Sequence, residues 1–120
     1  MAVTNGHLIS PRFPYILARV QVRQWAVDVE ALLDTGFDGD VAIPVGHMPN
    51  VGQPDGHTRW VLADGSRVLT PYYAGTVHLA GHGPFPATVI VLGDEPLVGA
   101  GAAQHVTIIL DHGRRVVVQP

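Results

Sequence analysis

Residues 31–43 read Ala-Leu-Leu-Asp-Thr-Gly-Phe-Asp-Gly-Asp-Val-Ala-Ile. An apolar run ends at Asp34, a short polar stretch holds two glycines, and a second apolar run begins at Val41. This order predicts a strand, a tight loop with a carboxylate at its start, and another strand. Gly36 and Gly39 permit backbone angles that other residues avoid, so the loop can fold tightly and present the Asp34 carboxylate from a rigid base.

The length and composition of the whole chain predict a single folded domain over residues 1–120. Such a domain is long enough to bury roughly two-thirds of the surface that the unfolded chain exposes. Hydrophobic residues make up 47% and charged residues 14%, which argues against disorder. No apolar run approaches the roughly 18 residues of a membrane span, and residues 1–10 lack the pattern of a secretory signal. We therefore expect no membrane association and a cytoplasmic location.

The charged and metal-binding residue types narrow the possible partners. All seven basic residues are arginines, and the only adjacent pair is Arg114-Arg115, so we expect no nucleic-acid binding, which needs a clustered positive face. The absence of cysteine excludes disulfides, thiolate metal sites and cysteine nucleophiles. Seven histidines leave a metal site as an alternative, but only His78 and His82 stand out as a close pair. We expect no cofactor.

The pattern before and after the Asp34 stretch is that of a mostly β chain, in which ten prolines and fourteen glycines separate short β-branched runs. Residues 1–14 carry prolines that argue against a central strand and predict an extended arm or an edge strand. Residues 15–22 and 25–34 predict a hairpin whose second strand leads into Asp34. Residues 45–57 predict a loop with one short turn.

The middle of the chain predicts two further hairpins. Residues 58–63 and 66–70 flank Asp64-Gly65, which predicts a type I′ turn with positive φ at both central positions. Residues 72–79 and 87–92 predict two strands separated by a turn at 81–84. The centre of the chain is therefore expected to be continuous β structure.

The last third holds the only helix candidate, the alanine-rich residues 100–105, between strands expected at 97–99 and 106–110. Such a short helix is marginal by itself, and Gly101 inside it costs up to about 1 kcal/mol relative to alanine, so packing must stabilise it. A last strand is expected at 115–118. Seven or eight short strands with one short helix predict a small barrel-like or sandwich-like β fold.

Asp34-Thr35-Gly36, with its apolar approach and the following Phe37-Asp38-Gly39, resembles the active-site loop of the retropepsin-like aspartic proteases. The small single-domain prokaryotic members of the pepsin/retropepsin clan are the most similar. A hairpin centred on residues 63–66, a segment at 94–99 that resembles the entry to the family's single helix, and a strand at 106–113 follow in the family's order. The resemblance covers roughly Val20 to Val118 and implies a small closed β-barrel with one short C-terminal helix.

The resemblance also implies an activity, that of an aspartic endopeptidase. Two carboxylates that share one proton can act as base toward water and as acid toward the peptide carbonyl. One Asp-Thr-Gly supplies half of this pair, so the family uses a homodimer in which Asp34 of each chain meets at a twofold axis. The expected substrate is an extended peptide or protein segment, bound in strand fashion.

Roles for the neighbouring residues follow from the same resemblance. Thr35 would tie the two loops together across the axis, Gly36 would let the backbone approach substrate, and Phe37 would pack beside the cleft. The hairpin over residues 59–70 would close over the peptide. The flap residues expected to contact the substrate are Ala63, Asp64, Gly65 and Ser66.

Several alternatives stay open at this stage. Asp, Thr and Gly are common turn residues, so the tripeptide by itself also fits an ordinary hairpin turn. Asp38 fits a turn-forming residue better than a second catalytic acid, and Trp25 and Trp60 fit core or interface positions better than ligand platforms. Residues 100–103 are small where the family has large apolar side chains. This departure leaves a catalytically weak or inactive dimerisation or peptide-binding module as the alternative function.

Overall fold

The computed structural model describes residues 2–4, 7–10 and 12–120. Within them, eleven strands, one 3-10 helix and one α-helix follow in this order: β1 (Ala2–Thr4), β2 (His7–Ser10), β3 (Tyr15–Val22), β4 (Trp25–Asp34), β5 (Val41–Ile43), η1 (Val45–His47), β6 (Gly56–Val61), β7 (Arg67–Leu79), β8 (His82–Val91), β9 (Leu97–Gly99), α1 (Ala100–Ala103), β10 (Thr107–Asp111) and β11 (Arg115–Gln119). No helix in these ranges is long and apolar enough to cross a membrane.

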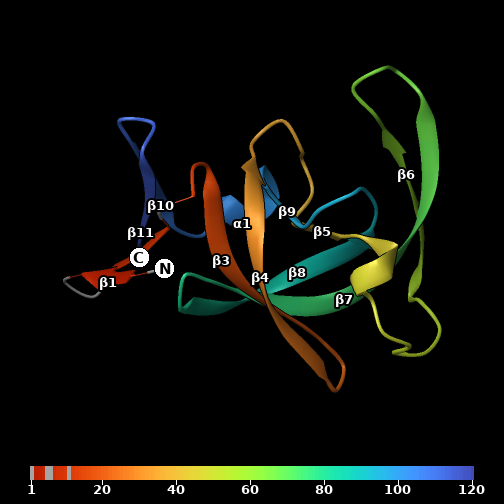
Figure 1. Cartoon of the computed structure of the whole chain (residues 1–120). Helices are drawn as coiled ribbons and strands as arrows, with labels where there is room; N and C mark the ends of the chain where they lie inside the picture. Colours follow the sequence, from red (N-terminus) through yellow and green to blue (C-terminus); the bar gives the residue numbers. More distant parts are fainter. Residues whose placement is uncertain (1, 5–6, 11) are drawn as a thin grey trace.

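Six of the strands form a closed barrel (Figure 1). Their order is β3-β4-β9-β5-β8-β7, and the pairing of β3 with β7 closes the ring. β9 is parallel to β4 and antiparallel to β5, and β5 is parallel to β8. The predicted mostly β fold, with a closed barrel and a short helix late in the chain, is confirmed.

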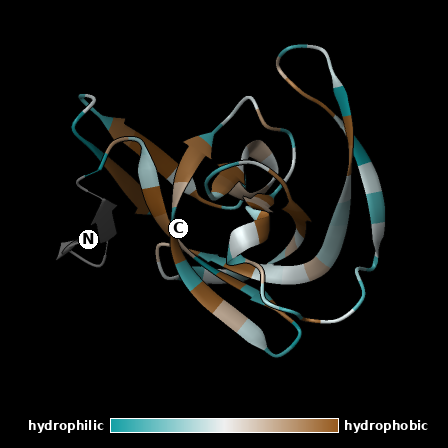
Figure 2. Cartoon of the chain, turned by 45° about the vertical axis from the view of Figure 1, so that its right-hand side comes forward, coloured by the Kyte–Doolittle hydropathy of each residue, from teal (hydrophilic) through white to brown (hydrophobic). Residues whose placement is uncertain are grey.

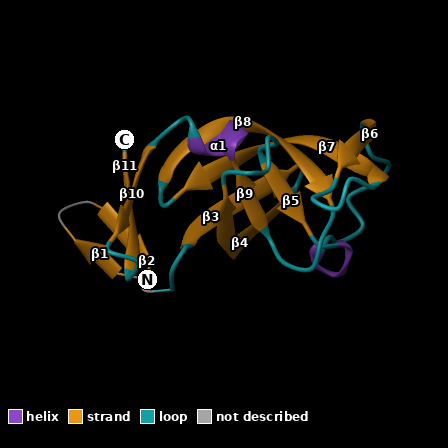
Figure 3. Cartoon of the chain, turned by 90° about the horizontal axis from the view of Figure 1, so that it is seen from above, coloured by secondary structure: helices purple, strands orange, loops and turns teal. Residues whose placement is uncertain are grey.

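The remaining strands extend the barrel in two directions (Figure 3). β6 pairs with β7 outside the ring, while β1, β2, β11 and β10 form a separate four-stranded sheet in that order. The prediction of an edge strand or arm over residues 1–14 is wrong for β2, which pairs with β1 on one side and β11 on the other. Both prolines of residues 1–14 follow Ser10, the last residue of β2, so neither lies within the strand. Residues 1, 5, 6 and 11 lie outside the described part of this segment.

β7 is one strand of 13 residues, whereas the sequence predicts two strands on either side of Pro71. Pro71 pairs with His57 of β6, and the pairing of β7 with β8 begins only at Tyr72. The proline therefore lies where β7 has a single neighbour, and its missing N–H breaks no ladder. This continuity lets the β6–β7 hairpin extend away from the barrel (Figure 1).

Two turns differ from their predicted form. The Asp64-Gly65 hairpin has no two-residue type I′ turn, because its loop spans residues 62–66 and only Gly65 has a positive φ, of 84°. The Gly65 N–H donates to the Leu62 carbonyl at 2.9 Å, which closes a wider loop. Positive φ at two successive residues occurs at Ala80 (50°) and Gly81 (85°), and again at His112 (54°) and Gly113 (69°). Because the first of these turns ends at Gly81, β8 begins at His82, inside the turn predicted over 81–84.

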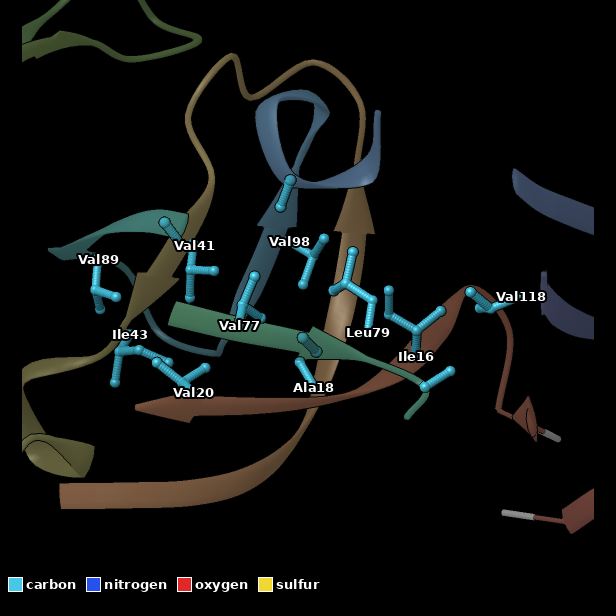
Figure 4. Packing of buried hydrophobic residues seen from close by; sticks show 14 of the residues in the cluster. Ile16, Ala18, Val20, Val41, Ile43, Val77, Leu79, Val89, Val98 and Val118 are labelled. Carbon is cyan, nitrogen blue, oxygen red and sulfur yellow. The ribbon is translucent and has the colours of Figure 1, made fainter. Parts of the chain in front are cut away.

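The core fills the barrel with aliphatic side chains that alternate along its strands. On β3 these are Ile16, Ala18, Val20 and Val22, each at most 1% exposed. Side chains of Val41, Val77 and Val89 from other strands meet them in the barrel (Figure 4). The intervening positions and the loops are more hydrophilic (Figure 2), as expected for strands with one buried face.

Candidate active site

Asp34 is the last residue of β4, where the strand leaves the barrel. β4 runs parallel to β9 there, with Leu33 opposite Val98 and Asp34 opposite Gly99. The Asp34 side chain folds back over its own loop, and its Oδ1 accepts a hydrogen bond from the Gly36 N–H at 3.0 Å. The Phe37 N–H donates to the Asp34 carbonyl at 3.2 Å. The carboxylate is therefore fixed at the start of a tight loop, but neither Gly36 nor Gly39 has a positive φ, so the loop does not use the backbone angles for which its glycines were predicted.

The Asp34 loop (residues 34–40) is bound to the β9–α1 junction (residues 99–101) by three backbone hydrogen bonds. The N–H groups of Gly99, Ala100 and Gly101 donate to the carbonyls of Asp40, Phe37 and Gly39, at 2.9, 2.8 and 3.1 Å respectively. Because these three consecutive N–H groups all bind the loop, its backbone is held along most of its length.

The two glycines of the junction allow this close contact. A Cβ at residue 99 would lie 2.2 Å from the Gly39 carbonyl oxygen and 2.6 Å from the Phe37 oxygen. At Gly101 it would lie 2.3 Å from the Asp40 carboxylate and 3.0 Å from a loop carbonyl. The helix is only four residues long, but Ala102 is 1% exposed and packs in the core. Small residues over 99–103 thus permit the close contact between the loop and the β9–α1 junction.

Two more carboxylates belong to the loop, with different surroundings. Asp40 is partly buried, and its Oδ2 accepts a hydrogen bond from the Thr88 N–H at 2.8 Å, which ties the loop to β8. Asp38 is exposed, and within the described part of the chain its side chain makes no hydrogen bond or ion pair. Asp40 therefore has a structural role, whereas the Asp38 carboxylate is not engaged by the loop.

A groove of about 360 Å³ lies between the loop and the β6–β7 hairpin, and we call it the Asp34 groove. The loop, the hairpin and the chain before β9 line it with Asp34, Gly36, Phe37, Asp38, Trp60, Val61, Leu62, Ala63, Leu92 and Leu97. The structure thus brings together four of the predicted site residues, namely Asp34, Gly36, Phe37 and Ala63. Thr35 is exposed next to the groove, and Asp64, Gly65 and Ser66 form the hairpin tip without lining it.

Trp60 is the main groove residue whose role the sequence did not indicate. Its ring lies against Phe37, with centroids 5.1 Å apart and planes tilted by 59°. A Cβ at Gly39 would meet both rings within 3 Å, so that glycine is needed to seat them. The residues of β6 alternate between partly buried and exposed, which places Thr58 and Trp60 on the same, partly buried face of the hairpin. This alternation could have indicated from the sequence that Trp60 faces inward, whereas nothing in the sequence indicated a role for Leu92.

The hairpin tip is held by its own polar groups. Asp64 Oδ1 accepts hydrogen bonds from the Ser66 hydroxyl at 2.6 Å and from the Ser66 N–H at 2.8 Å. The Ser66 hydroxyl, and then its N–H, lower the pKa of Asp64 below its ordinary value. Nearby, Val61 is 67% and Leu69 60% exposed, so the hairpin presents apolar side chains to solvent.

The segment before β9 is fixed to the start of β3. The Tyr15 hydroxyl donates to Glu95 Oε1 at 2.7 Å, and this bond is the main reason that the pKa of Tyr15 is raised. The Arg12 guanidinium lies 3.8 Å from the centre of the Tyr15 ring. These contacts position the chain between Leu92 and Leu97, the two leucines that line one side of the Asp34 groove.

The histidines do not assemble a metal centre in the described ranges, where no group of three or more His, Asp or Glu side chains could hold an ion. His78 and His82 lie on β7 and β8 on either side of the Ala80-Gly81 turn. Phe85 stacks on His105, with ring centroids 4.7 Å apart.

Comparison of the sequence with protein-family models and with curated proteins found no match. The assignment of a function therefore depends on the groove, the loop and the hairpin.

Proposed function

We propose that this chain is one half of an aspartic endopeptidase of the retropepsin type, in which Asp34 of two chains activates a water molecule for peptide hydrolysis. The observation that carries the proposal is the position of Asp34, at the start of a loop bound by the β9–α1 junction and facing a groove beneath a hairpin. A fixed carboxylate beside a groove that can accept an extended chain is what peptide hydrolysis needs.

The dimer follows from the chemistry of the carboxylate. One carboxylate acts as the base while the other supplies the proton, and two in contact share a single proton because both cannot ionise together. Asp38 also lines the groove, but it belongs to the same loop and nothing holds its side chain toward Asp34. A second copy of the chain supplies an equivalent of Asp34 by twofold symmetry, the commonest arrangement in homo-oligomers. The two titrations then belong to the pair.

The test is cleavage of an extended-peptide library at mildly acidic to neutral pH, followed by mass spectrometry. The wild-type chain should cleave, and Asp34→Asn should lower kcat at least about 100-fold, the smallest effect typical of losing a catalytic acid or base. Asp28→Asn is the matched control. Asp28 lies on the same strand, exposed and paired with Arg19 at 3.2 Å, outside the groove.

The alternative, a dimeric peptide-binding module without turnover, uses the same groove. It predicts that the wild-type chain and Asp34→Asn both bind peptides and that neither cleaves them. Cleavage that is lost in Asp34→Asn and retained in Asp28→Asn excludes this alternative. Equal cleavage by wild type and Asp34→Asn removes Asp34 from the mechanism.

A further inference from the structure

A second cavity of about 410 Å³ lies next to the Asp34 groove, and we call it the side pocket. Trp60 lines both spaces, so the two are neighbours along the inner face of the hairpin. Gly39 and Ile90 contribute to the walls of the pocket.

The polar groups of the side pocket make few contacts within the protein. Thr58 and Tyr72, which are partly buried, and Thr88, which is exposed, line it, and within the described residues their hydroxyls have no protein partner and stay open to solvent. The Trp60 Nε1 is buried and unpartnered as well. Buried indole N–H groups usually find an acceptor, and leaving one unmade is costly. A ligand that supplies hydrogen-bond partners would satisfy these groups.

The charge of the pocket restricts that ligand. Asp40 is the only ionisable carboxylate among the lining residues, and its Oδ2 already accepts the Thr88 N–H. No arginine or histidine lines the pocket. An acidic side chain would be repelled by Asp40, and an aliphatic one would leave the hydroxyls and the indole N–H unmet. A neutral carboxamide offers an acceptor and two donors, which suits this mixture.

We propose that the side pocket is a specificity subsite that binds a glutamine-type carboxamide side chain of the peptide substrate, near the bond that Asp34 cleaves. This inference rests on the proposed function for the position of the scissile bond. In an extended peptide, side chains two residues apart lie on the same face, about 6–7 Å from each other. One side chain can thus occupy the Asp34 groove while another on the same face reaches around Trp60 into the pocket.

The experiment compares peptides that are identical except for one residue, which is Gln, Glu or Met, placed in turn at each position within three residues of the cleaved bond. These three side chains have similar size and differ in hydrogen bonding and charge. At one position, Gln should raise kcat/KM about 10-fold or more over both Glu and Met, as expected for a site that hydrogen-bonds its ligand. Equal rates for all three at every position, or a preference for Glu, would overturn the proposal.

Thr58→Val tests whether the preference for Gln arises in the side pocket. It removes one hydroxyl while nearly keeping the shape of the side chain, and it should reduce the Gln-over-Met ratio about 5-fold, the scale of one neutral hydrogen bond. Thr107→Val makes the same change at an exposed position of β10, in the separate four-stranded sheet, and should leave the ratio unchanged. A ratio unchanged in Thr58→Val and in Thr88→Val would assign the preference to another part of the protein.

A binding measurement separates this proposal from the proposed function. Trp25 lies in the β3–β4 hairpin and lines neither space, so Trp25→Phe leaves Trp60 as the only tryptophan. Titration of this variant, carrying Asp34→Asn, with the three peptides should change Trp60 emission and give at least about 10-fold tighter binding for the Gln peptide. If the wild type cleaves nothing, the peptidase proposal fails, and this titration alone decides the subsite. Equal affinities would reject it.

Discussion

The two sides of the Asp34 groove are built in contrasting ways. On the loop side, three backbone hydrogen bonds join residues 37–40 to residues 99–101, and the spacing is so close that two positions accept only glycine. On the hairpin side, residues 61–66 are exposed, and the tip is held mainly by contacts within itself. Such a site can keep a carboxylate in place on the tightly bound loop, while the hairpin, which has few contacts outside itself, can move to admit a peptide.

The largest effect should come from disturbing the rigid side. Gly99→Ala would place a methyl group 2.2 Å from a backbone oxygen that cannot move aside without breaking the loop contact. We expect unfolding free energy to fall by about 3 kcal/mol, the upper end of overpacking effects, with loss of any peptidase activity. Chemical denaturation followed by circular dichroism measures the change.

Gly46→Ala is the matched control for this prediction. Gly46 lies in η1 without a positive φ, and nothing lies within 4 Å of the position that a methyl group would take there. Alanine at this position should be neutral or stabilise by about 0.4–1 kcal/mol by reducing the freedom of the unfolded chain. Similar destabilisation by both substitutions would show that the 99–101 contact is not specially tight.

A smaller effect is expected at Asp40, which joins the loop to β8. Asp40→Ala removes the acceptor of the Thr88 N–H and should lower stability by about 1–3 kcal/mol. Asp40→Asn keeps a side-chain carbonyl at nearly the same place, so it should cost clearly less. The comparison is made by thermal or urea unfolding of the two variants, and equal losses would show that the charge matters more than the hydrogen bond.

On the hairpin side, Gly65→Ala should cost only about 1 kcal/mol. Its φ is 84°, which alanine adopts with strain, but nothing lies within 4 Å of the added methyl group. Because the tip is separate from the loop, we expect KM for peptides to rise while kcat changes little. A fall in kcat as large as that of Gly99→Ala would contradict the contrast between the tightly bound loop and the separate hairpin.

The smallest effect concerns the pH dependence of the tip. The pKa of Asp64 is lower in the folded chain than in the unfolded chain, so the Ser66 bonds contribute stability above the ordinary carboxyl pKa, and this contribution is lost as pH falls through the depressed value. The Ser66 amide signal in a pH titration by NMR should report this step. Ser66→Ala should move the Asp64 pKa back up, because the hydroxyl is the largest cause of the shift, and an unmoved pKa would refute that assignment.

Much of the fold could be predicted from local pattern. Alternation along residues 15–34 and the apolar run into Asp34 indicate the first hairpin, and the isolated alanine-rich stretch indicates the single short helix. The errors arose where the outcome depends on partners distant in the sequence. Pro71 is compatible with a continuous strand only because β8 pairing begins after it, and β2 gains its second neighbour from β11, at the other end of the chain.

The candidate site could also be predicted only where it depends on residues close together in the sequence. The Asp34 loop is read from consecutive residues, and its hydrogen bond to Gly36 is local. By contrast, the need for glycine at residue 101 comes from a contact with Asp40, and the position of Trp60 comes from the way the hairpin folds over Phe37. The wider turn at Asp64 reflects a side-chain bond to Ser66 that competes with the type I′ geometry.

The claim that two chains each contribute Asp34 to one site is tested most directly by subunit mixing. Wild-type and Asp34→Asn chains are unfolded, combined in equal amounts and refolded together, and peptidase activity is compared with that of the same total amount of wild-type chain. If each site needs Asp34 from both chains, random pairing leaves about a quarter of the activity. A value of about one half, equal to the fraction of wild-type chains, would show that each chain acts alone and would contradict the account.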